Sequence, residues 1–476
     1  MFANHHRLFL LTTLCLLLLF LAACERPSAQ PQFAVVNPPV QPVANLTATP
    51  TLAPTRTATE VAQMLPTATD IPPTSTPVIT PTPFYTGELS PPCGLSLPIL
   101  PTNIDPTDTA VNENEDLVAQ IRATIPDTAL PAFQRLLTAP ESVGLVVYRM
   151  GDEANGIYWN ADTQMPLASV SKLIHLVAYA EAAAAGQIDP TSIVTVEEIE
   201  RYYLPNYDLG AHNRALDELE DQERLLANPT RMQLEDVPWM MTRFSSNAAT
   251  DYLHMLLGQA RIEQTAVSLN LTQQTAPCTW VGQFLAMGNH TRQGFSDRQA
   301  VLNYVENPEL YGAEAALFAD AYSSSDTFRR EDNNWHTQTR RPSVDTQRLF
   351  ANQLNAHGTP REYANLMARI AQNGLSNPES SFLARRYLEW PMIFLDNQDY
   401  FSNLGYKNGA LPGIVTTVYY AYPKGENAPI VVALFYKDLP QRTYRQWRRE
   451  VWPDDEFARW LLIDDQAIPL LRALLN

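Results

Sequence analysis

The chain has 476 residues, of which 45% are hydrophobic and 18% are charged, and its formal net charge is −18. This length allows two or three soluble domains of ordinary composition. The acidic charge is spread along the chain and argues against nucleic acid as a partner, because phosphate binding needs a basic surface. No cysteine or histidine pair has metal-ligand spacing, so no metal or other cofactor is expected.

The first 24 residues form a targeting segment. The apolar run "LFLLTTLCLLLLFLAAC" is short for a membrane span and ends in small residues. Its last residues, Leu21, Ala22, Ala23 and Cys24, resemble the bacterial lipobox, in which the cysteine is lipidated. A plain secretory signal and an N-terminal anchor helix are the alternatives. All three interpretations place the rest of the chain outside the cytoplasm. The lipobox interpretation also predicts that a lipid on Cys24 anchors the protein to the membrane.

Residues 25–92 are dominated by Pro, Thr, Ala and Gln and lack aliphatic periodicity. Such a segment cannot bury enough apolar surface to offset its chain entropy, so it is predicted to be a disordered, extended tether. The folded domain is predicted to span residues 93–476. It contains Cys93 and Cys278, and in an oxidising compartment a disulfide between them is favoured over two separate buried thiols.

The folded part begins with an amphipathic stretch over residues 114–137. The segment "GLVVYRMGDEANGIYWNA" then predicts a β-hairpin. A helix is expected to begin at Ser169 and to end near Gly186, because apolar residues recur there at helical spacing. A mostly helical middle follows.

The second half closes with strands. A helix with a capping box is expected from Thr359 to Gly374. Three β-type runs follow at residues 403–408, 415–422 and 429–437, and the last helix is expected to break at Pro469. Strands from both ends of the chain can close one antiparallel sheet, which predicts an α+β fold with a helical lobe.

Three short motifs carry the chemistry. Ser169 and Lys172 form S-x-x-K at a helix start, where residues i and i+3 share one face and the helix dipole favours an alkoxide. Ser245-Ser246-Asn247 follows between two apolar helical runs, and Lys407-Asn408-Gly409 lies on a predicted strand. Each motif alone is explained equally well by helix capping or a solvated lysine, whereas the three in this order are not.

This order resembles the motif set of class A β-lactamases and penicillin-binding proteins. The resemblance covers residues 110–476, with a poor match over 275–355. It implies a β-lactamase/transpeptidase-like fold, with an antiparallel five-stranded sheet flanked by helices and an all-helical lobe.

By the same resemblance, Ser169 is the acylated nucleophile, and Lys172 is its base or a hydrogen-bond relay. Ser245 passes the proton to the leaving nitrogen, and Lys407 supplies positive charge to the substrate carboxylate. The substrate-binding residues are Asn247, Asn408, Gly409 and Ala410, and the backbone N–H groups of Ser169 and Ala410 form the oxyanion hole.

Two features depart from the family. Asn408 stands where the family has Thr or Ser, so carboxylate recognition is expected to differ. The glutamate that activates water for deacylation is not evident, and Glu306 or Glu309 in "ENPELYG" are its only candidates; an exposed acid in a loop is the alternative. The polar segment 323–347 is expected to be a surface loop beside the cleft.

The leading hypothesis is therefore an extracytoplasmic, lipid-anchored and monomeric serine hydrolase that cleaves β-lactams through an acyl-serine intermediate. One alternative is a D-alanyl-D-alanine peptidase or esterase that deacylates β-lactams slowly, with a cell-wall peptide as its substrate. Another alternative is a non-catalytic binding module of the cell envelope.

Overall fold

The structure is a computed structural model that describes residues 93–97, 114–290, 294–338, 341–449 and 452–475. The chain divides into two units, Met1–Pro83 and Phe84–Asn476, and all described residues belong to the second. The predicted lipobox at Cys24 and the predicted tether 25–92 lie outside the described residues. Among the helices that are described, none is long and apolar enough to cross a membrane.

A five-stranded antiparallel sheet forms the centre of the fold, with the strand order β2-β1-β9-β8-β7. The predicted hairpin is present as β1 and β2, and β1 also pairs along its whole length with β9. The N-terminal and C-terminal strands therefore share one sheet, as predicted. The strands are β1 (Val143–Arg149), β2 (Ile157–Trp159), β7 (Phe401–Leu411), β8 (Ile414–Pro423) and β9 (Ile430–Tyr436).

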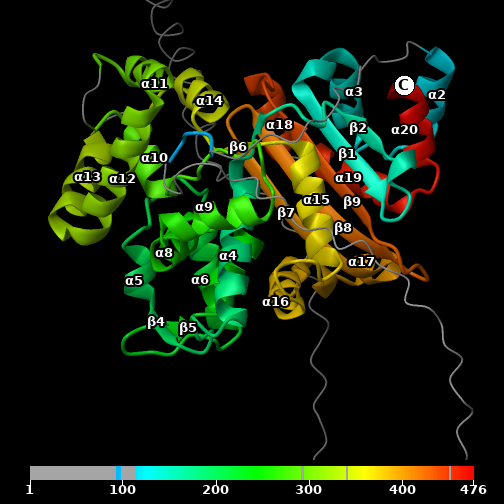
Figure 1. The fold of residues 1–476 in the computed structure, drawn as a ribbon. Coiled ribbons are helices and arrows are strands. Elements are labelled where there is room, and N and C mark those ends of the chain that lie inside the picture. Colours follow the sequence, from blue (N-terminus) through cyan, green and yellow to red (C-terminus); the bar gives the residue numbers. More distant parts are fainter. Residues whose placement is uncertain (1–92, 98–113, 291–293, 339–340, 450–451, 476) are drawn as a thin grey trace, which may run out of the picture. The chain divides into compact units, whose positions relative to one another are not determined.

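Helices cover both faces of the sheet (Figure 1). Every residue of β9 is buried, which is expected for a central strand with apolar layers on both sides. One face packs against α2 (Glu115–Thr124), α3 (Leu130–Thr138), α19 (Pro453–Ile463) and α20 (Ala467–Leu475). The other face packs against α15 (Pro360–Ala371) and the helices beyond it. The predicted α+β architecture is confirmed.

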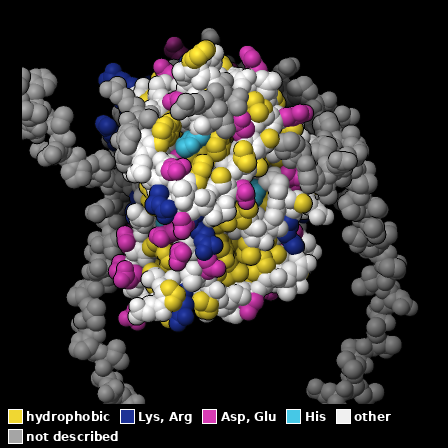
Figure 2. Space-filling view, turned by 90° about the vertical axis from the view of Figure 1, so that its left-hand side faces the viewer, with side chains coloured by type: hydrophobic (Ala, Val, Ile, Leu, Met, Phe, Trp, Pro, Cys, Tyr) yellow, Lys and Arg dark blue, Asp and Glu magenta, His cyan; other side chains and the backbone are white. Residues whose placement is uncertain are grey.

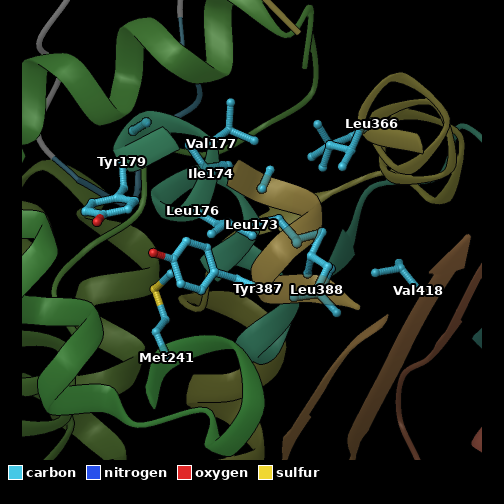
Figure 3. Close-up of a cluster of buried hydrophobic side chains, with 14 of the residues drawn as sticks. Leu173, Ile174, Leu176, Val177, Tyr179, Met241, Leu366, Tyr387, Leu388 and Val418 are labelled. Carbon is cyan, nitrogen blue, oxygen red and sulfur yellow. The ribbon is translucent and has the colours of Figure 1, made fainter. Parts of the chain in front are cut away.

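Helix α4 (Lys172–Ala184) is almost entirely buried and lies at the centre of the apolar core on one side of the sheet. Its apolar side chains pack against Leu366 of α15 and against Tyr387 and Leu388 of α16 (Pro378–Leu388), as Figure 3 shows. Burial on almost all sides holds this helix in place, so its first turn is a firm platform for side chains. The S-x-x-K motif lies at that first turn.

A separate group of helices packs around its own apolar core, which contains Trp280, Phe284, Tyr311 and Phe350. The predicted surface loop 323–347 belongs to this group and is mostly helical, so that prediction was wrong. Phe328 and Trp335 lie seven residues apart on one face of α13, and both contact the ring of His290. The helices of this group, here called the α10–α14 lobe, are α10 (Trp280–Met287), α11 (Asp297–Glu306), α12 (Pro308–Ser324), α13 (Asp326–Gln338) and α14 (Val344–Gln353).

Some element ends differ from the expectation. The last helix does break, but the break lies at residues 464–466, and Pro469 is accommodated in the first turn of α20, where a proline removes no helical hydrogen bond. Thr359 caps α15 by accepting the N–H of Glu362, as predicted. The Glu362 carboxylate also accepts hydrogen bonds from Thr272 and Gln273.

The remaining elements are short or peripheral. Acidic and basic side chains are interspersed on the face shown in Figure 2, with apolar side chains between them. Further elements are β3 (Met165–Pro166), the 3-10 turn η3 (Ala168–Ser171), β4 (Ile193–Thr195), α5 (Val196–Glu200), α6 (Ala211–Asp221), β5 (Arg231–Gln233), α7 (Asp236–Trp239), the π-turn η4 (Met240–Phe244), α8 (Asn247–Leu257), α9 (Gln259–Ser268), β6 (His357–Gly358), the 3-10 turn η5 (Trp390–Ile393), α17 (Leu395–Tyr400) and α18 (Gln441–Arg449).

Candidate active site

Ser169 lies in the 3-10 turn η3, which leads directly into α4, so the regular helix begins at Lys172 and not at Ser169. The residue before it, Ala168, is fully buried and has a φ of 47°, which is uncommon for a residue with a Cβ. The hydroxyl of Ser171 donates to the carbonyl oxygen of Ala168 at 2.8 Å. The turn that carries Ser169 is thus strained at Ala168 and is held by the hydrogen bond from Ser171.

The second motif follows the π-turn η4. Ser245 has a φ of 67°, and Asn247 is the first residue of α8. Ser246 is buried and caps α8 by accepting the N–H of Ala249, so its hydroxyl is occupied by the fold. The two outer residues of S-x-N are therefore the ones left to face a neighbouring segment.

Lys172 and Lys407 meet at Ser245. Lys172 Nζ donates to Ser245 O at 2.6 Å, to Asn247 Oδ1 at 2.7 Å and to Ser245 Oγ at 3.3 Å. Lys407 Nζ, from β7, donates to Ser245 Oγ at 3.0 Å and to the carbonyl oxygen of Asn408 at 2.6 Å. Segments that are 73 to 162 residues apart in the sequence are therefore joined through one serine hydroxyl.

Both lysines are buried, and burial favours their neutral forms. Burial lowers the pKa of Lys172 well below its ordinary value, and the neighbouring Lys407 lowers it further. Burial also lowers the pKa of Lys407 to about 7, although the charge of Asp455 acts to raise it. A neutral Lys172 can accept a proton, which is the property required of a base beside a serine nucleophile.

The third motif brings β7 against the backbone of Ser169. A Cβ at Gly409 would lie 2.5 Å from Ser169 N and 2.8 Å from Leu167 O, so only glycine allows this approach. Asn408 and Ala410, on either side, are partly exposed, and β7 is an edge strand of the sheet. Backbone groups on the outer side of β7 can therefore meet an extended substrate.

Trp280, which the sequence analysis did not single out, covers Lys172. The centre of its indole ring lies 4.8 Å from Lys172 Nζ, and the side chain is only 3% exposed. Buried Asp251 fixes it in place by accepting the backbone N–H groups of Trp280 and Val281, each at 2.7 Å. No local sequence signal links residue 280 to residue 172, because the contact depends on how α10 packs against α8.

The two deacylation candidates do not approach this constellation through any hydrogen bond. Glu306 and Glu309 are exposed, at the end of α11 and in the first turn of α12. The acceptors that receive hydrogen bonds from Lys172 are a carbonyl, a hydroxyl and an amide oxygen. Within the described residues, no carboxylate is hydrogen-bonded to Lys172.

Cys93 and Cys278 form a disulfide, with their Cα atoms 4.9 Å apart. Cys278 lies two residues before Trp280, so the bridge fixes the chain where it enters the α10–α14 lobe. In the described part of the chain, no group of three or more His, Cys, Asp or Glu side chains could hold a metal ion.

A family model described as "Beta-lactamase enzyme family" matches residues 131–301 of this chain. The matched part contains Ser169, Lys172, Ser245 and Asn247, whereas Lys407 lies beyond it. Among curated proteins, none matches this chain.

Several solved structures are similar to this chain. A β-lactamase from Sphaerobacter thermophilus has a TM-score of 0.44 and 17% identity, covering 73% of this chain and 98% of its own. A β-lactamase from Chitinophaga pinensis has a TM-score of 0.42 and 12% identity, covering 70% and 98%. The structure of PBP-A has a TM-score of 0.41 and 15% identity, covering 76% and 99%.

Proposed function

We propose that the protein is a serine enzyme that is acylated on Ser169 by β-lactams or by D-alanyl cell-wall peptides. The observation that carries the proposal is the meeting of Lys172 and Lys407 at the Ser245 hydroxyl, beside the segment that holds Ser169. The family match over residues 131–301 supports the same chemistry. A binding module would not require two buried lysines at one hydroxyl, because burying each ammonium is costly.

Acylation would proceed as follows. Ser169 Oγ attacks the substrate carbonyl carbon while its proton passes to neutral Lys172 Nζ. The N–H groups of Ser169 and Ala410 stabilise the oxyanion. Lys172 then returns the proton through Ser245 Oγ to the leaving nitrogen, the C–N bond breaks, and the acyl group remains as an ester on Ser169.

Before attack, Lys172 Nζ must turn from its present partners toward Ser169. It donates to Ser245 and Asn247 and not to the nucleophile. Catalytic hydrogen bonds are often loose without substrate, so this arrangement is compatible with the mechanism. Residues 169 and 172 are three apart where the 3-10 turn η3 runs into α4, so their side chains share one face.

The surroundings of Lys172 favour slow release of a β-lactam acyl group. Hydrolysis of the ester needs a water molecule and a base to activate it. Trp280 covers Lys172, and buried Asp251, whose charge acts on Lys172, already accepts two backbone N–H groups. The slowly deacylating alternative is therefore better supported than rapid β-lactam hydrolysis, which the sequence analysis put first.

The enzyme would act outside the cytoplasm, anchored through Cys24. The lipobox-like residues 21–24 support this location, and so does the Cys93–Cys278 disulfide, since such bonds persist in oxidising compartments. Cys24→Ser should move the protein from the membrane fraction to the soluble fraction. If it stays in the membrane fraction, lipidation at Cys24 is not what anchors it.

The test of the activity is to incubate the full chain with a fluorescent penicillin and, separately, with a chromogenic cephalosporin. We expect a covalent label that survives a denaturing gel, with little cephalosporin turnover. Rapid turnover would instead favour the β-lactamase function. Ser169→Ala should lose the label completely, whereas Ser402→Ala, an exposed serine on β7, should keep it. If wild type and Ser169→Ala behave alike, the proposed function is wrong.

A further inference from the structure

The peptide group between Leu167 and Ala168, just before the nucleophile, is held at both ends. The hydroxyl of Thr416 on β8 donates to Leu167 O at 2.8 Å. The Ala168 N–H donates to Asn355 Oδ1 at 2.9 Å. The sheet thus holds one side of this peptide and Asn355 holds the other.

The orientation of this peptide matters because Ala168 is in the left-handed region, with a φ of 47°. For a residue with a Cβ this conformation carries a steric cost. A strained conformation persists only where surrounding contacts determine it. The next peptide carries the Ser169 N–H, so any relaxation of Ala168 would turn that N–H away from the substrate oxygen.

Asn355 is itself fixed. It is 2% exposed, and its Nδ2 donates at 3.2 Å to Oε1 of Gln283, which is 3% exposed. Because the amide nitrogen is occupied by Gln283, the amide oxygen must face Ala168. Gln283 belongs to α10, one turn after Trp280, which covers Lys172.

We propose that Asn355 is a positioning residue for acylation. By accepting the Ala168 N–H, it keeps the strained turn in the conformation that aims the Ser169 N–H at the developing oxyanion. Through Gln283, it makes that conformation depend on the α10–α14 lobe. This inference rests on the proposed function, because it concerns the rate of the same acylation step.

The experiment measures the rate constant for acylation by a fluorescent penicillin, together with thermal unfolding of the same full-length variants. Asn355→Leu removes the acceptor at similar volume and should slow acylation on the order of 10- to 100-fold, since losing an oxyanion-hole donor outright costs ~100- to 1,000-fold. The initial non-covalent binding constant should change little. Asn355→Asp keeps an acceptor oxygen for Ala168 but loses the donor to Gln283, so it should restore only part of the rate.

A second variant separates positioning from general destabilisation. Glycine adopts a positive φ without strain, so Ala168→Gly in the Asn355→Leu background should recover part of the lost rate. The matched control is Asn397→Leu, a buried asparagine of α17 whose side chain is also bonded at both ends. This control should lose stability without slowing acylation.

The outcomes are distinct. A folded Asn355→Leu variant that acylates at the wild-type rate overturns the inference, and so does an Asn355→Asp variant as slow as Asn355→Leu. If Asn355→Leu does not fold, Gln283→Leu breaks only the outer bond and should still slow acylation several-fold; a wild-type rate there overturns the inference. Absence of label on wild type refutes the proposed function and the inference with it.

Discussion

Asp251 should make the folded protein less stable as the pH rises, which is opposite to the effect of an acid whose pKa is lowered by a salt bridge. Its carboxyl group is fully buried in α8 and accepts the N–H groups of Trp280 and Val281. Burial raises its pKa from the ordinary value of 3.8 to about 7, although the two N–H donors and Lys172 oppose the rise. The perturbation that tests this is Asp251→Asn, which removes the titrating group.

The sign follows from counting protons. Between pH 4 and 7 the folded state keeps the proton of Asp251, while the unfolded chain has released it. The stabilisation is therefore complete below pH 4 and is lost as the pH rises through 7. Three pKa units at 1.36 kcal/mol each give about 4 kcal/mol for this loss.

The assay is urea unfolding of wild type and Asp251→Asn at several pH values from 4 to 8. The free energy of unfolding of wild type, minus that of the variant, should fall by up to about 4 kcal/mol over this range. Glu306→Gln, which replaces an exposed acid, should give a difference that does not change in this way. If the two curves of wild type and Asp251→Asn run parallel, the buried carboxyl does not titrate as argued.

Three further predictions concern the site and its support. Gly409→Ala should slow acylation at least ~10-fold, because its Cβ would lie 2.5 Å from the nucleophile's backbone nitrogen, whereas Gly374→Ala, with 3.3 Å to its nearest neighbour, should not. Burial lowers the pKa of Lys407 to about 7, so Lys407 loses its charge above this pH. The rate of acylation by a penicillin, which carries a carboxylate, should therefore fall about tenfold per pH unit above 7. Acylation by an ester without a carboxylate should not show this fall. Cys278→Ser opens a bridge between residues 185 apart and should lower the free energy of unfolding by about 2–5 kcal/mol in urea titrations.

The sheet and the three motifs could be predicted from the sequence because their signals are local. The runs around Val146, Val418 and Val432 alternate or stay apolar over strand lengths, and all three became strands. The pair Ser169 and Lys172 is separated by one helical turn, so its proximity needs no tertiary information. The glycine in Lys407-Asn408-Gly409 is different, because its reason appears only in the structure, in the close approach of β7 to Ser169.

The α10–α14 lobe was not predictable in the same way. The segment around α13 has many polar and charged residues, and its two aromatic anchors, Phe328 and Trp335, are isolated in the sequence. Both rings contact His290, which lies outside α13 and far from either residue in the sequence, so these contacts are absent from any short window. Tertiary packing therefore stabilises a helix at α13, although the polar local sequence predicted a loop.

The same lobe explains why the candidate site could only be predicted in part. It leaves the rest of the domain at Cys278 and returns at Asn355. Both ends touch the candidate site, because Trp280 lies over Lys172 Nζ and Asn355 accepts the N–H of Ala168. A segment with its own apolar core can vary in length and sequence without disturbing the sheet. Because its two ends meet Lys172 and Ala168, such variation would still act on the proposed acylation of Ser169.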